Sequence, residues 1–429
     1  MVNKKQTLSK TTIALPRPLF DTLDNISVEM AEKQLPAAFV EPGDFSHKYK
    51  ADYLITRQFL MEYKGSLDTF NSYRRELERL MQWCMLIRKL TFTALSREDI
   101  LSFVDFCAHP PSHWVGLNNT AARFIDKNGL REANPDWRPF IVRVPKSQKQ
   151  PKKQSQQTAK VSNFSLSNNA MKALFRVLSS FFRYLFEEDY ISSNPVAKIR
   201  QKSRYIKKTT DARLNRTLSI TQWKYVIEAA ETLAHQAPAK HERTLFIMSA
   251  LYAMYLRVSE LTDTPRWTPQ MNHFYKDSSS NWWFKTVGKG NKEREITVSD
   301  DMLQSLKRYR LSLGLTALPS PQENSPLIPK SRGYGGISST RQIRRIVQDC
   351  FDCAANELIG DNLTEESDFL RAATVHWMRH TGISRDVLTR QREHVRDDAG
   401  HSTSAITDLY IDIEKKDRHK SGKNKKIQP

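Results

Sequence analysis

Four short segments in the second half of the chain carry side chains suited to one kind of chemistry. In chain order they hold Arg257 and Glu260, then Lys289, then His376 and Arg379, then His401 with Tyr410 nine residues later. Attack on a phosphodiester builds negative charge on its non-bridging oxygens, which two permanently charged arginines can bind in a fork. A lysine can protonate the leaving 5′-oxygen, and a histidine can exchange protons near neutral pH. A phenol forms a stable ester with phosphate once it has lost its proton.

Taken alone, each segment also has a purely structural interpretation. Arg257 and Glu260 could form a buried ion pair, and Lys289 could be a solubilising residue of a turn. Tyr410 could be half-buried on a helix. His376 has no second ligand at a recognised metal spacing, and the glycines near Lys289 are too few for a nucleotide-binding loop. We therefore expect no metal and no cofactor, and the four segments together favour phosphodiester chemistry.

A helix, a hairpin and further helices are the elements expected to position these residues. The apolar run 245–256 predicts a helix that meets Arg257, and Glu260 follows on the same face of a continuing turn. Two β-prone runs, 282–287 and 292–298, flank a Gly/Asn turn and predict a hairpin with Lys289 at its tip. His376 and Arg379 are three residues apart on a predicted helix, so both point one way.

The first half of the chain predicts a helical domain preceded by an extended arm. Residues 1–47 contain four prolines and no long apolar period, with room for one short helix. From Phe70 to Met85 the apolar positions recur at three- and four-residue steps, which is typical of one helix face. Ser96 with Asp99 predicts a helix start. Ser167 begins another helix, whose apolar stripe is Met171, Leu174, Phe175, Leu178, Phe181, Phe182 and Leu185.

Two basic stretches poor in apolar residues, 143–160 and 201–216, interrupt the helical pattern. Either could be a solvated loop, but the second lies where one domain ends and Thr221 opens a new helix. A linker that crosses a phosphate backbone would use such a composition. The predicted divisions are an arm at 1–47, a helical domain at 48–200, a linker at 201–218, a catalytic domain at 219–415 and a basic tail at 416–429.

Composition points to a polyanionic partner and to a reducing compartment. The 429 residues carry a net charge of +20 with a pI near 9.7, although charge alone does not separate DNA from RNA or an anionic membrane surface. No apolar run reaches the roughly 18 residues of a membrane helix, and the start of the chain lacks the apolar stretch of a secretory signal. Four cysteines fit a cytoplasmic protein, and the Cys350–Cys353 pair is interpreted as helix packing rather than a metal or redox site.

The four segments resemble the tyrosine recombinase, or phage integrase, family. The matching pieces are Leu-Arg-Val-Ser-Glu-Leu at 256–261, Gly-Lys-Gly-Asn-Lys-Glu-Arg at 288–294, His-Trp-Met-Arg-His-Thr at 376–381, and Gly-His-Ser at 400–402 followed by Tyr410. They occur in the family's order, and the resemblance covers roughly residues 219–415. Residues 48–200 are similar in style to the family's SAM-like core-binding domain, although they carry no motif.

The resemblance implies a role for each residue of the set. Arg257 and Arg379 would clamp the scissile phosphate, and Tyr410 would be the nucleophile. Lys289 would be the general acid, with Lys292 as a rival that the family pattern disfavours. His376 would assist proton transfer at the tyrosine, His401 would bond a phosphate oxygen, and Glu260 would support the site from behind. Further DNA contacts are expected at Lys202, Arg204, Lys207, Lys208, Arg341, Arg344 and Arg345.

The sequence departs from the family pattern in three places. Tyr255 stands where the family often has glycine, and Ala399 replaces a common leucine before Gly-His-Ser. The stretch 262–281, between the first arginine and the hairpin, looks long. None of these departures removes a catalytic group.

The fold implied is mainly α-helical with a small antiparallel β-sheet in the catalytic domain, arranged as a two-domain, C-shaped DNA clamp. The activity implied is site-specific cleavage and rejoining of DNA through a 3′-phosphotyrosine, for integration, excision or transposition of a mobile element. The partners implied are double-stranded recombination sites, a homotetramer at synapsis, and accessory DNA-bending or element-encoded proteins. The alternatives are a type IB topoisomerase-like enzyme, a non-catalytic DNA-binding regulator, and an RNA-binding protein, for which no recognition motif is found.

Overall fold

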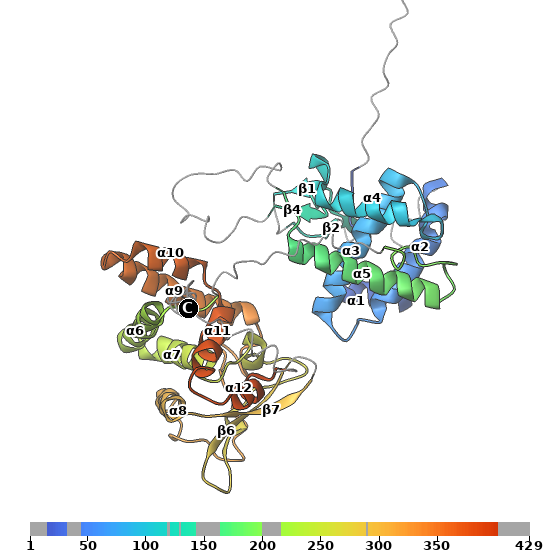
Figure 1. The fold of residues 1–429 in the computed structure, drawn as a ribbon. Helices are drawn as coiled ribbons and strands as arrows, with labels where there is room; N and C mark the ends of the chain where they lie inside the picture. The colour runs from blue at the N-terminus through green and yellow to red at the C-terminus, as the bar shows by residue number, and fades with distance from the viewer. Residues whose placement is uncertain are drawn as a thin grey trace, which may run out of the picture. The chain divides into compact units, whose positions relative to one another are not determined.

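The computed structural model describes residues 15–31, 44–117, 121–127, 130–142, 164–199, 216–288 and 291–401 (Figure 1). The chain divides into two compact units, Met1–Thr209 and Thr210–Pro429. Each unit has a hydrophobic core of its own. Within the described ranges, no helix is both long and apolar enough to cross a membrane.

Helices make up most of the first unit. They are α1 (Leu23–Ala31), α2 (Asp44–Met61), α3 (Leu67–Trp83), α4 (Arg97–Ala108) and α5 (Asn168–Glu187), with short helical turns at Cys84–Arg88, Phe92–Ala94 and Ser112–Trp114. As predicted, Ser96 and Asp99 form a capping box at the start of α4. Ser167 caps α5, and every residue of its predicted apolar stripe is buried.

Two small pairs of strands in the first unit were not predicted. Strand β1 (Val115–Gly116) pairs in parallel with β4 (Phe140–Ile141), and β2 (Phe124–Lys127) pairs antiparallel with β3 (Leu130–Ala133). Both pairs are only two to four residues long. Such short strands are held by tertiary contacts and leave almost no alternating pattern to find in a sequence.

Residues 15–31 are packed into the first unit, unlike the extended arm expected over 1–47. Phe20 and Ile26 are fully buried in its core. The buried Glu78 carboxylate accepts hydrogen bonds from the backbone N–H groups of Leu19 and Phe20, and it also binds Arg123. Hydrogen bonds between residues this distant in sequence leave no local signal. Residues 1–14 and 32–43 of the expected arm lie outside the described residues, and residues 44–47 begin α2.

The second unit packs helices against one small sheet. Its helices are α6 (Ile220–Gln236), α7 (Pro238–Ala253), α8 (Asp300–Ser312), α9 (Thr340–Gly360), α10 (Thr364–Ala372), α11 (Val375–Asp386) and α12 (Arg392–Ala399), with short turns η8 (Val258–Leu261) and η9 (Met271–His273). The sheet has the order β5 (Phe274–Lys276), β6 (Trp282–Val287), β7 (Glu293–Thr297), antiparallel throughout. Strands β6 and β7 form the predicted hairpin.

Three details of this unit refine the sequence predictions. Helix α6 begins at Ile220, after Ser219, which shares a capping box with Gln222, so the predicted opening at Thr221 was one residue late. The long stretch 262–281 supplies η9 and the extra strand β5. Cys350 is fully buried on α9, where burial raises its thiol pKa to about 12, so the reactive thiolate is disfavoured and the helix-packing interpretation fits.

Candidate active site

Glu260 is the buried centre of an ion cluster in the second unit. Its side chain is 1% exposed and forms an ion pair with Arg257 Nη1 at 2.9 Å. The Arg257 backbone N–H also donates to Glu260 Oε2 at 2.8 Å, which closes the turn η8 around the pair. Burial alone would raise the carboxyl pKa, but Arg294 and Arg257 together hold it below its ordinary value. Glu260 is therefore an anion that fixes the Arg257 loop.

Arg294, on strand β7, ties three segments together. Its two terminal nitrogens bind both Glu260 oxygens, at 2.8 and 2.7 Å, in the paired geometry that only arginine provides. Its Nε donates to the carbonyl of Asp398, at the end of α12, at 3.0 Å. One guanidinium thus joins the hairpin, the Arg257 loop and the segment that leads to His401. The ribbon shows α12 next to β7 (Figure 1).

Two glycines leave room for this arrangement. A Cβ on Gly400 would lie 2.8 Å from Arg294 Cδ, and its φ of +63° also favours glycine. A Cβ on Gly288 would lie 2.9 Å from Arg294 Nη1 and 3.3 Å from Arg257 Nη1. Gly288 directly precedes Lys289 in the chain, so the hairpin reaches its turn beside Arg257.

Helix α11 carries His376 and Arg379, as predicted. The Arg379 side chain is 2% exposed and donates to the carbonyls of Tyr255 and Ala399. These carbonyls come from the end of the Arg257-bearing segment and from the end of α12. The guanidinium is therefore oriented by backbone groups from two other parts of the unit before any ligand arrives.

Tyr255, at the position where the family pattern often has glycine, adopts a backbone conformation that glycine favours. Its φ is +50°, in the left-handed region that disfavours side chains. The side chain is fully buried, and its hydroxyl donates to Asp386 while accepting from Arg390 Nη1. These contacts stabilise a strained residue whose carbonyl accepts a hydrogen bond from Arg379.

Both predicted histidines experience the charge of both predicted arginines. Burial lowers the pKa of His376, and Arg379 and then Arg257 lower it further. Burial lowers the pKa of His401 to about 4, again with contributions from Arg379 and Arg257. His380, whose ring meets that of His376 edge-on at 4.5 Å, also has its pKa lowered to about 4, first by burial and then by His376. Residues from η8, α11 and the end of α12 therefore converge at one electropositive place.

Two named proteins are similar to this chain in sequence. No family model matches the chain. It is 26% identical to tyrosine recombinase XerC of Alcanivorax borkumensis over 176 residues, which span 41% of this chain and 52% of that protein. It is 27% identical to tyrosine recombinase XerC of Thermodesulfovibrio yellowstonii over 243 residues, spanning 56% of this chain and 69% of that protein. The chain is thus similar in sequence to two proteins named as tyrosine recombinases.

A solved structure extends the likeness to the fold. The crystal structure of the XerH site-specific recombinase bound to palindromic difH substrate, a post-cleavage complex, matches with a TM-score of 0.54 at 13% identity. The match covers 89% of this chain and 87% of that one. The mainly helical architecture with small sheets is thus a tyrosine recombinase fold.

Some of the predicted site residues lie outside the part of the chain that the structure describes. They are Lys289, Tyr410, Lys202, Arg204, Lys207 and Lys208. Arg341, Arg344 and Arg345 lie in the first turns of α9, all exposed. Sequence reasoning did not single out Arg294, although it stands in the quoted segment 288–294. Arg294 is mostly buried, whereas the other described charged side chains of this hairpin are exposed to solvent, and this difference can be seen only in the folded structure.

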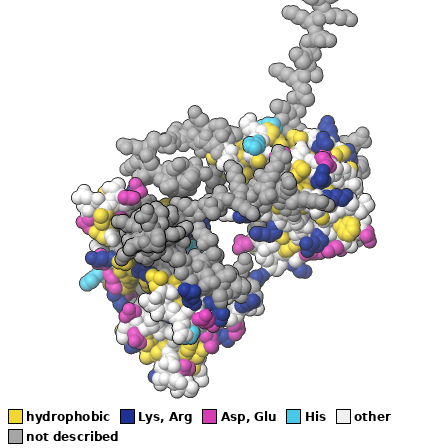
Figure 2. Space-filling view, viewed as in Figure 1, with side chains coloured by type: hydrophobic (Ala, Val, Ile, Leu, Met, Phe, Trp, Pro, Cys, Tyr) yellow, Lys and Arg dark blue, Asp and Glu magenta, His cyan; other side chains and the backbone are white. Residues whose placement is uncertain are grey.

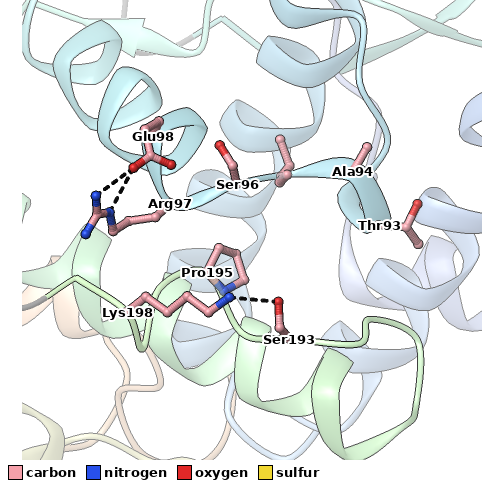
Figure 3. Close-up of a pocket in the computed structure, with 9 residues that line it drawn as sticks. Thr93, Ala94, Ser96, Arg97, Glu98, Ser193, Pro195 and Lys198 are labelled. Carbon is pink, nitrogen blue, oxygen red and sulfur yellow. Dashed lines mark hydrogen bonds and ion pairs between the residues drawn. The ribbon is translucent and has the colours of Figure 1, made fainter.

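A pocket in the first unit shares no residue with this cluster. It is lined by residues 93–98 together with Ser193, Pro195 and Lys198 (Figure 3). Arg97 binds Glu98 at 2.7 Å, and Lys198 Nζ is 3.1 Å from Ser193 Oγ. Its charged groups are thus already engaged locally, and none of the predicted catalytic residues lines it.

Proposed function

We propose that this protein is a site-specific DNA recombinase that cuts and rejoins DNA through a 3′-phosphotyrosine at Tyr410. The observation that carries the proposal is the convergence of Arg257, Arg379, His376 and His401 around one electropositive place. The substrate would be double-stranded recombination sites. The biological setting would be integration, excision or transposition of a mobile element.

The proposed chemistry is a transesterification in which no net bond energy is lost. The Tyr410 oxygen attacks the phosphorus, the new O–P bond forms, and the bond to the 5′-oxygen breaks. Lys289 gives the leaving oxygen its proton, and His376 takes up the phenolic proton. Arg257 and Arg379 stabilise the charge on the non-bridging oxygens, and His401 donates to one of them. Attack by the 5′-hydroxyl of another strand reverses these steps.

Charge and chain architecture support a DNA partner. The net charge of +20 favours a polyanion. The XerH structure that shares this fold is described as a complex with its difH substrate after cleavage. Recombination joins two duplexes through four cut strands, so four protomers would act together, with accessory DNA-bending proteins as further partners.

Covalent trapping tests the proposal. Nicked duplexes taken from the DNA that flanks the coding gene would be incubated with the wild-type protein, with Tyr410→Phe and with Tyr225→Phe. Tyr225 is a matched control, because its hydroxyl donates from α6 to Asp361 at the end of α9, and neither residue belongs to the proposed catalytic set. We expect adducts from the wild type and Tyr225→Phe, and binding without adduct from Tyr410→Phe.

The alternatives predict different results in the same assay. An adduct in Tyr410→Phe at the wild-type level would refute the assignment of the nucleophile. DNA binding with no adduct from the wild type, across all flanking duplexes, would favour the non-catalytic regulator. Relaxation of a supercoiled plasmid that lacks any flanking repeat would favour the topoisomerase-like enzyme.

A further inference from the structure

A glycine-framed loop in the second unit leaves a tyrosine wholly in solvent. We call residues 330–336, with the sequence Lys-Ser-Arg-Gly-Tyr-Gly-Gly, the Tyr334 loop. Tyr334 is 99% exposed, more than any other large apolar side chain in the described ranges. An aromatic ring kept in water contributes little to the fold, and its flat face and hydroxyl are available to a partner.

The backbone holds this loop in a defined shape. Pro329 and Gly336 form an antiparallel bridge, and Lys330 N–H donates to the Gly335 carbonyl at 3.0 Å. Gly333 and Gly335 have φ of +79° and +84°, which favour glycine, although a Cβ on Gly333 would meet nothing within 4 Å. The loop is therefore built for backbone shape and not for close packing.

The base of the loop is anchored to the core and to the active-site segment. Ile328 and Ile337 are each 1% exposed and are joined by a hydrogen bond of 2.9 Å. The Ile337 carbonyl accepts from the backbone N–H of Asp263, which follows the Glu260 turn, at 2.7 Å. Arg243 Nη1 on α7 binds Ser331 Oγ at 2.8 Å. The residues that flank the exposed tip are thus buried and hydrogen-bonded, and they connect directly to the segment that follows Arg257 and Glu260.

The surroundings of the loop along the chain are strongly basic. Between Glu323 and Asp349 the sequence has no acidic residue, and it contains Lys330, Arg332, Arg341, Arg344 and Arg345. All five basic residues are exposed. Among the described residues none of them forms an ion pair within 4.0 Å. The Asp263 carboxylate, which would lie 3.9 Å from a Cβ on Gly335, accepts a hydrogen bond from Thr268. On the face of the molecule drawn in Figure 2, basic and acidic side chains are interspersed.

We propose that the Tyr334 loop contacts the sugar–phosphate backbone of duplex DNA outside the reacting phosphate. Lys330 and Arg332 bind phosphates, the Tyr334 ring packs on a deoxyribose, and its hydroxyl donates to a phosphate oxygen. The inference rests on the proposed function only in taking DNA as the partner. A protein partner fits less well, because the loop exposes one ring among cations and glycines and lacks the apolar area of an interface core.

Binding across a salt series tests this contact. Affinity for a single duplex half-site would be measured in the Tyr410→Phe background, which keeps the chemical step out of the readout. The double variant Lys330→Ala/Arg332→Ala should reduce the slope of log affinity against log salt by about 1.8, at about 0.9 per phosphate contact. Tyr334→Ala should weaken binding roughly 2- to 10-fold with the slope unchanged, because the lost group is neutral.

Three variants serve as matched controls. Lys224→Ala removes a cation that is 67% exposed and pairs with Glu228 on α6, and Leu311→Ala removes an apolar side chain that is 60% exposed on α8. Neither should change affinity or slope beyond error. Tyr334→Phe should keep the part of the affinity that comes from the ring and lose the part that comes from the hydroxyl.

Several outcomes would overturn the proposal. It would be overturned if both loop variants bound DNA with the affinity and salt slope of the wild type. It would also be overturned if Lys224→Ala lost as much affinity as the loop variants. Half-site binding left intact while assembly on a full site is lost would assign the loop to a neighbouring protomer instead. A larger loss on duplex RNA than on DNA would reassign the partner. The proposed function is tested by the covalent adduct of the wild type, and the loop contact is tested by the salt series. Either proposal can therefore fail without the other.

Discussion

Arg379 shows how this site is prepared at the level of single residues. Its guanidinium donates to two backbone carbonyls, Tyr255 and Ala399, that belong to different segments. Arg257 is held in the same way by Glu260. Fixing both cations in advance avoids reorganisation when charge develops on a phosphate, which is the main source of electrostatic catalysis.

Replacing either arginine by lysine should therefore abolish most activity. Arg257→Lys and Arg379→Lys keep the charge but lose the fork, and each should slow cleavage about 100- to 1,000-fold. Single-turnover cleavage of a nicked duplex measures this. Arg371→Lys is the control, because Arg371 is exposed on α10 and binds only Asn356 among described residues. Near wild-type cleavage by either active-site lysine variant would show that arginine to be structural.

The histidines give the folded protein a defined response to acid. Because the folded pKa values of His380 and His401 are lowered to about 4, the unfolded chain, at about 6.5, binds more protons between these values. The contribution of these two histidines to the free energy of unfolding is therefore complete above about pH 6.5, and it is lost as the pH falls toward 4. His401→Gln should make stability less sensitive to pH between 7 and 5. Urea unfolding of both proteins at pH 7, 6 and 5 checks this, and parallel curves would contradict it.

At the scale of elements, the site depends on how closely α11 approaches α7. Gly382, one turn beyond Arg379 and on the buried side of α11, makes this approach possible: a Cβ there would lie 2.2 Å from the Tyr252 carbonyl and 3.0 Å from the Tyr255 ring. Backbone atoms cannot yield as a flexible side chain does. Any added atom must move the helix that carries His376 and Arg379.

Gly382→Ala should consequently destabilise the protein and lower activity. Overpacking of this kind costs about 1–3 kcal/mol, and the displaced helix should also slow cleavage. Gly360→Ala is the matched control, since Gly360 also lies in a helix but a Cβ there would meet nothing within 4 Å. The control should be neutral or stabilising by up to about 1 kcal/mol. Chemical denaturation of both variants decides, and equal stabilities would refute the packing argument.

At the scale of the whole molecule, charge is the property that bears on function. The chain carries 67 Lys and Arg against 47 Asp and Glu, and its two units have separate cores. Cations are concentrated in the predicted linker, of which the structure describes only residues 216–218, and in the predicted tail, which lies outside the described residues. Residues 416–429 contain a single acid, Asp417, and one apolar residue, Ile427.

Deleting residues 416–429 should weaken DNA binding at all sequences alike. The tail has too little apolar surface to dock on a neighbouring protomer, so phosphate binding is the better prediction. The slope of log affinity against log salt should then fall by roughly 0.9 per lost contact. A salt series on full-length and truncated proteins measures it. An unchanged slope combined with lost recombination would indicate coupling between protomers instead.

The sequence by itself determined the features that depend on neighbours along the chain. The capped starts of α4 and α5, the β6–β7 hairpin and the Arg257–Glu260 pair all follow from residues within a few positions of one another. Side-chain caps, turn residues and apolar periodicity act over this short range, so they can be recognised without the fold. The motifs of the candidate site were recognisable for the same reason.

Only the tertiary structure decided which residues hold these pieces together. Arg294 meets the Asp398 carbonyl across 104 residues, Arg379 meets that of Tyr255 across 124, and Glu78 binds the backbone of Leu19 across 59. The positive φ of Tyr255 is likewise maintained by Asp386 and Arg390. No local pattern encodes such pairs, because each partner alone is an ordinary charged residue or carbonyl, and their energy appears only when packing removes both from water.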